Sequence, residues 1–158
     1  MEGYYFIAYD VQDARAQQCA SWIAGRLGNM AVLPQQSWTL GYWTPYLEHI
    51  VSRAERIIVV LTAGFVRSRE PFVQYQRTLV LQERVESSQE HYSFSRLLMA
   101  LASDCESLLH DESVFSRDYD WVDLRPLLNA EEACQQVLLD ALCSSGASEQ
   151  AACFEHVP

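Results

Sequence analysis

Lysine is absent from this chain of 158 residues, because all 11 basic side chains are arginines. Three kinds of chemistry need a lysine ammonium group at a defined place: Walker-type phosphate binding, Schiff-base catalysis and the switch of receiver domains. The sequence excludes all three. It also has no G-x-G-x-x-G stretch after its first predicted strand, so the dinucleotide-binding fingerprint is missing.

Paired cysteines and clustered histidines are missing as well. Five cysteines are an odd number, and none lies in a C-x-x-C pair, which argues against a disulfide framework and against a zinc site. We interpret them as reduced thiols of the core or the C-terminal tail. The four histidines are dispersed, and none lies beside a plausible nucleophile or a second metal ligand. We expect no metal and no required cofactor.

The chain has few basic residues for its acidic ones, with a formal net charge of -10 and a pI near 4.7. This charge repels nucleic-acid phosphates and anionic lipid, so we expect proteins or small molecules as partners. No stretch approaches the roughly 20 apolar residues of a membrane helix. The opening residues MEGYYFIAYD lack the basic and long apolar regions of a signal peptide, and we therefore expect a cytoplasmic protein.

Hydrophobic patterns along the chain predict strands that alternate with helices. Short apolar runs predict strands over residues 4–10, 30–33, 56–62, 96–103 and 119–124. Helical spacing and end signals predict helices over residues 13–29, 42–54, about 71–86 and 129–143. The run RIIVVLT is apolar on both faces, as in a central strand covered by helices. We expect an α/β fold of the flavodoxin-like kind, with a doubly wound, five-stranded parallel sheet and helices on both faces.

Residues 1–143 should form this one domain, and residues 144–158 lack sustained periodicity and should form a flexible tail. Doubly wound sheets place ligands and partners at the carboxyl ends of their strands. Three loops are therefore candidates for the functional site: residues 10–12, 34–43 and 63–71.

The loop PQQSWTLGYWTPY is dense in aromatic residues for a simple connection. Its rings could fold back on the core as a lid, or they could form a recognition surface beside a flexible glycine. The candidate interaction residues are Trp38, Thr39, Leu40, Gly41, Tyr42 and Trp43.

Charged residues near these loops also have two readings. Asp10 is either a pocket carboxylate or a capping or solvated residue, with Asp13 as a further candidate cap. The pairs Arg53 with Arg56 and Arg67 with Arg69 either neutralise an acidic partner or are solvated helix ends.

Several motifs together resemble the TIR (Toll/interleukin-1 receptor) domain family, over about residues 3–143. YYFIAYD resembles the first TIR box, and AERIIVVLTAGFVRS resembles the third strand with its serine-ended loop. DYDWVDL followed by EEACQQVLLDAL resembles the last strand and helix. The stretches QSWTLG, RLLMALASDC and VDLRPLLNAEEA are most similar to free-standing microbial TIR proteins. After the tryptophan the chain departs from their pattern, because T-L-G stands where an aspartate and an R-P-G turn are usual.

This resemblance implies one of two activities, because some TIR domains cleave NAD at the nicotinamide bond and others only assemble. The enzymes use a glutamate near the start of the helix expected over residues 71–86, where its charge stabilises an oxocarbenium-like ribose. Two alignments place Gln74 or Gln76 at that position, and a neutral amide cannot supply the charge. Losing such a term commonly costs about 10² to 10³ in rate.

The expected function is therefore a TIR signalling or scaffold protein of an innate-immune or defence-type pathway. It would act by homotypic TIR–TIR assembly, as a homo-oligomer or with other TIR domains, through the loop at residues 38–43 and the helix that carries the two glutamines. The alternative is an NAD+ nucleosidase in which Glu70 or Asp10 replaces the missing carboxylate, and Tyr9, Asp10 and Tyr75 would then contact NAD. A third reading, a domain that binds a nucleotide without turnover, is opposed by the missing glycine-rich fingerprint.

Overall fold

The computed structural model describes residues 3–34, 43–89, 97–103, 121–126, 135–137 and 139–140 of the chain. Its five strands are β1 (Tyr5–Ala8), β2 (Ala31–Val32), β3 (Arg56–Leu61), β4 (Leu97–Leu101) and β5 (Trp121–Asp123). They form one sheet in the order β2-β1-β3-β4-β5, and every neighbouring pair is parallel. This is the order of flavodoxin-like sheets, so the predicted fold class is confirmed.

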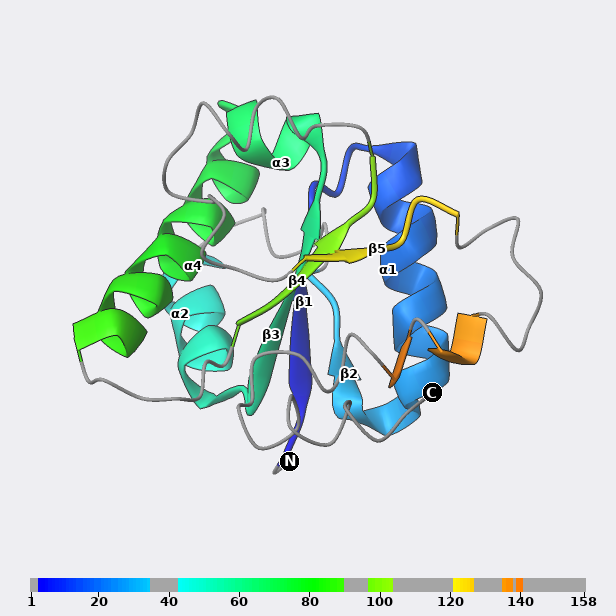
Figure 1. Ribbon diagram of the computed structural model, residues 1–158. Coiled ribbons are helices and arrows are strands. Elements are labelled where there is room, and N and C mark those ends of the chain that lie inside the picture. The colour runs from blue at the N-terminus through cyan, green and yellow to red at the C-terminus, as the bar shows by residue number, and fades with distance from the viewer. Residues whose placement is uncertain are drawn as a thin grey trace.

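Helices lie on both faces of the sheet (Figure 1): α1 is on one side, and α2 and α4 are on the other. Their bounds are α1 (Ala14–Leu27), the 3-10 turn η1 (Gly28–Met30), α2 (Trp43–Arg53), α3 (Ala63–Arg67) and α4 (Pro71–Gln89). The connection from β1 through α1 to β2 runs one way along the sheet, and β3, β4 and β5 follow the other way. The direction reverses between β1 and β3, which in this class of fold is where ligands bind.

The core lies between the sheet and its helices. Every residue of β3 and of β4 is buried, as the apolar run of residues 56–62 predicts for a central strand. One face of α1 packs on the sheet through Ala16, Cys19, Ala20 and Ile23. Cys19 is buried and forms no disulfide, and burial raises the pKa of its thiol, in agreement with a reduced core cysteine.

The ends of α1 agree with the signals in the sequence. The Asp13 side chain accepts a hydrogen bond from the Ala16 N–H at 3.0 Å, and Gly28 ends the helix with a φ of 62°. Such a positive φ favours glycine over residues with a side chain. Asp13, and not Asp10, is therefore the residue that caps α1.

Two helical features differ from the prediction. The short helix α3 was not expected, because five residues cannot show helical periodicity, and only the side chain of Thr62, which accepts from the Phe65 N–H at 3.2 Å, marks its start. Helix α4 extends to Gln89, a little beyond the expected end. Of the closing helix predicted over residues 129–143, residues 135–137 and 139–140 are helical, and the rest, with the tail at 144–158, lies outside the described residues.

No helix in the described part of the chain is long and apolar enough to cross a membrane.

Candidate functional site

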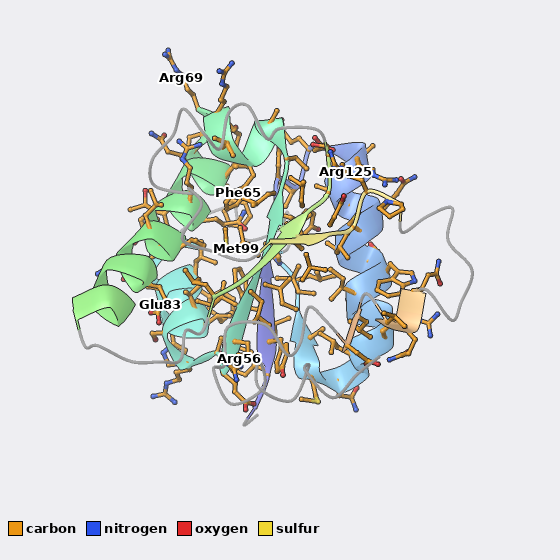
Figure 2. The ribbon with its side chains drawn as sticks, in the orientation of Figure 1. Arg56, Phe65, Arg69, Glu83, Met99 and Arg125 are labelled. Carbon is orange, nitrogen blue, oxygen red and sulfur yellow. The ribbon has the colours of Figure 1, made fainter. Side chains whose placement is uncertain are left out.

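The candidate site lies where β1 and β3 end and α4 begins. Tyr9 and Asp10 follow β1, Thr62 and Gly64 follow β3, and Gln76 reaches the same edge from the second turn of α4. Figure 2 labels Phe65 of α3, which lies near this edge of the sheet, and Arg69, which extends away from the sheet. The topology thus brings the loop at residues 10–12 next to the one at 63–71.

Gln76 is joined to the main chain of Tyr9 at both ends of its amide. Its Oε1 accepts from the Tyr9 N–H at 3.1 Å, and its Nε2 donates to the Tyr9 carbonyl oxygen at 3.2 Å. The side chain is 1 % exposed. This pair of bonds satisfies the first residue beyond β1 in the way a neighbouring strand would, and it needs one donor and one acceptor. A carboxylate offers only acceptors, so the geometry selects an amide.

Gln74 lies on a different face of α4, because two residues along a helix correspond to about 200° of rotation. Its side chain is exposed, while its N–H donates to the Glu70 carbonyl at 2.9 Å as part of the first helical turn. The two positions that the alignments assign to the family glutamate therefore lie in different environments. Residue 74 is on the solvated surface, and residue 76 is in the core.

Glu70, the first candidate substitute carboxylate, forms the start of α4. Its Oε2 accepts from the Val73 N–H at 3.0 Å, and its own N–H donates to Ser68 Oγ at 3.1 Å. This is the arrangement of a helix N-cap, which adds a favourable interaction with the helix dipole. The carboxylate is thus bound to the end of the helix.

Asp10, the second candidate, is buried, at 8 % exposure. Its Oδ1 accepts from the Gln12 N–H at 3.0 Å, which closes a turn after β1. Its Oδ2 lies against Gly64 so closely that a Cβ built on that glycine would overlap it and would stand 3.3 Å from Cγ. Within the described residues no hydrogen bond to Oδ2 is found, so this oxygen could accept one from a hydroxyl or amino group.

The two tyrosines of the candidate site lie in different surroundings. Tyr9 is buried, and burial raises the pKa of its phenol. Tyr75 donates its hydroxyl hydrogen to Glu48 Oε1 of α2, and this bond, with smaller effects of burial and of the Glu48 charge, raises the pKa of Tyr75 to about 12. Tyr75 therefore joins α4 to α2 and is not grouped with Asp10.

Two arginines that sequence analysis did not single out hold this edge together. Arg77 Nη1 donates to the carbonyl oxygens of Phe65, Val66 and Ser68 at 3.0, 2.9 and 3.1 Å, and so caps the C-terminus of α3. Arg15 Nε donates to the Ala102 carbonyl at 3.2 Å, and its Nη2 donates to the Arg125 carbonyl. Arg15 thereby links the ends of β4 and β5. Nothing in the spacing of either arginine indicates these long-range bonds.

The other candidate arginines divide into two groups. Arg53, Arg67 and Arg69 are exposed, in agreement with solvated helix ends or a contact surface. Arg56 is 7 % exposed and begins β3, so its interpretation as a solvated helix end was wrong. Helix α2 ends at Arg53, and Arg56 is the first residue of the buried strand β3.

The aromatic loop falls largely on residues that are not described. Trp38, Thr39, Leu40, Gly41 and Tyr42 lie outside the described residues, and Trp43 is the first residue of α2. Of the histidines, His49 is exposed on α2 and the other three also lie outside. In the described ranges no group of three or more histidine, cysteine, aspartate or glutamate side chains could hold a metal ion.

Comparison with protein-family models gives no match, and neither does comparison with curated proteins or with solved structures.

Proposed function

We propose that this protein is a TIR-type interaction module that signals by homotypic assembly, in an innate-immune or defence-type pathway of the cytoplasm. The observation that carries the proposal is the double hydrogen bond between the Gln76 amide and the Tyr9 main chain. The resemblance of the sequence motifs to TIR domains supplies the family, and the flavodoxin-like strand order agrees with it.

The chemistry around the start of α4 supports assembly over catalysis. The enzymes of the family need a charged carboxylate at this place, and here the buried position holds a neutral amide whose oxygen and nitrogen each form a hydrogen bond to the Tyr9 main chain. The nearby carboxylate of Glu70 already accepts from the Val73 N–H. Using either side chain for a ligand would break a contact that stabilises the start of α4 or the end of β1.

Asp10 Oδ2, which accepts no hydrogen bond from the described residues, favours a second candidate function, an NAD+ nucleosidase. In that reaction water adds to the ribose carbon as nicotinamide leaves and one proton is released. A carboxylate in the reversal point of the sheet could bind the ribose hydroxyls or stabilise positive charge on the sugar. Tyr9 and Tyr75 would complete the NAD contacts in this alternative. The packing of Asp10 on Gly64 opposes it, because the oxygen faces main chain.

The test combines two measurements on the same purified protein. Self-association is followed by light scattering over a wide concentration range, and NAD cleavage by release of nicotinamide over hours at micromolar protein. The proposal expects concentration-dependent oligomers and no turnover. A protein that stays monomeric and finds no TIR partner would overturn it, and turnover that disappears in Asp10→Asn would establish the alternative.

Gln74→Glu is the informative gain-of-function variant. Its side chain is exposed, so a carboxylate is tolerated there without changing the core. Activity gained on this substitution would identify residue 74 as the position that aligns with the family glutamate. Gln76→Glu is less suited to this purpose, because it disturbs the bond to Tyr9.

A further inference from the structure

We propose that residues 67–70, the last residue of α3 and the turn that joins it to α4, form the positively charged contact through which one copy of the chain docks on the acidic surface of a second copy. We call this segment the arginine turn. The inference rests on the proposed function, since it identifies the electrostatic half of the homotypic contact.

Self-assembly of this chain has to overcome repulsion between two copies that each carry a net charge of -10. A stable contact therefore needs positive side chains that are not already neutralised. Most arginines with described side chains are engaged within the protein. Arg15 and Arg77 donate to main-chain carbonyls, Arg26 lies over the Trp22 ring at 5.2 Å, and Arg125 pairs with Asp123 at 2.7 Å.

Arg53, Arg67 and Arg69 are different. All three are exposed, and within the described part of the chain they have no hydrogen bond or ion pair. Arg67 and Arg69 are two residues apart in the arginine turn, and Arg69 extends away from the body of the protein (Figure 2). Arg53 stands alone at the end of α2. In the described part of the chain, the arginine turn is thus where two guanidinium groups without a partner occur together.

Glu70 follows Arg69 directly in the sequence, and its carboxylate accepts from the Val73 N–H at 3.0 Å and so caps α4. Among the described residues it forms no ion pair with Arg67 or Arg69. The nearest acid in the sequence therefore does not pair with either guanidinium group.

The turn is also held in one conformation before any partner binds. Arg77 donates to the carbonyl oxygen of Ser68 in the turn and to those of Phe65 and Val66 in α3, and Ser68 Oγ accepts from the Glu70 N–H. A contact loop that is already ordered loses less conformational entropy on binding. Because arginine can bind a carboxylate with two parallel hydrogen bonds, the two arginines suit the aspartates and glutamates of an acidic protein surface.

The test compares three variants with the parent by sedimentation velocity: Arg67→Gln with Arg69→Gln, Arg69→Gln alone, and Arg53→Gln. The two single variants lower the net charge equally and differ only in position, so Arg53→Gln is the matched control. We expect the double variant to weaken self-association about tenfold, and Arg53→Gln to match the parent. The gap between parent and double variant should close near 0.5 M NaCl, where the Debye length falls to a few ångströms.

Equal association of the parent and the double variant at low salt would overturn this inference and leave the proposed function standing. An equal loss in Arg53→Gln and Arg69→Gln would also overturn it, because the effect would then follow net charge and not the arginine turn. A parent that is monomeric at every concentration and salt would overturn both.

Discussion

Replacing Gln76 by glutamate should destabilise the fold, although the two side chains have nearly the same shape. The substitution keeps an acceptor for the Tyr9 N–H and removes the donor to the Tyr9 carbonyl, so two oxygens face each other in the core. A buried group left without its partner costs about 1–3 kcal/mol, and an uncompensated buried charge costs about 3–5 kcal/mol. We expect a loss of about 3–5 kcal/mol in the free energy of unfolding at pH 8.

The loss should depend on pH in a definite direction. Burial raises the pKa of the introduced carboxyl group in the folded state above its unfolded value of about 4.3. The folded state then prefers the neutral acid, whose O–H can donate to the Tyr9 carbonyl. The loss is therefore small below about pH 4 and grows by about 1.4 kcal/mol per pH unit until the folded pKa is reached.

Urea denaturation of the parent and the variant at pH 4.5 and pH 8, followed by tryptophan fluorescence, measures both effects. Gln74→Glu is the matched control, because the same change on the exposed face of α4 should alter stability by no more than about 0.5 kcal/mol. Equal losses for the two glutamines, or a loss at residue 76 that does not shrink at low pH, would refute the reasoning.

Two further predictions concern neighbouring contacts. Gly64→Ala should cost about 1–3 kcal/mol, since the new methyl group overlaps Asp10 Oδ2, whereas in an Asp10→Ala background it should be neutral or stabilising, because alanine is favoured over glycine in helices by about 1 kcal/mol. Denaturation of the four proteins of this cycle measures the coupling, and an equal loss in both backgrounds would disprove the contact. Tyr75 should ionise near pH 12, so the stability from its bond to Glu48 is fully present below about pH 10 and is lost as pH rises through about 12. The difference in absorbance at 295 nm between the parent and Tyr75→Phe follows this ionisation, and a midpoint that Glu48→Gln does not move toward 10 would contradict it.

The fold was predictable because local signals agreed with one another. The alternation of apolar runs and amphipathic segments was enough for a parallel sheet, and the doubly apolar run at residues 56–62 marked its centre. Asp13 and Gly28 marked the two ends of α1. Each of these features depends on residues that are close in sequence, and so it is visible without the structure.

The candidate site was less predictable because its contacts join distant parts of the chain. The bond between Gln76 and Tyr9 spans 67 residues, and the bond from Arg15 to Ala102 spans 87. The sequence placed the two glutamines near the start of a helix, as the structure has them, but it could not tell the buried one from the exposed one. The two glutamines lie about 200° apart around the helix, and the two competing alignments do not decide which of them faces the core.

The contrast between residues 74 and 76 gives a physical reason why neither position carries a glutamate. At residue 76 the end of β1 needs a side chain that both donates and accepts, and a carboxylate there would destabilise the strand that organises the edge. A carboxylate at residue 74 would be exposed, and water would weaken its field. Asp10, the remaining buried carboxylate of this edge, is pressed against Gly64. Glu70, Gln76 and the Oδ1 of Asp10 bind the main chain of this edge, and this supports the proposal that the protein acts through contacts on its surface.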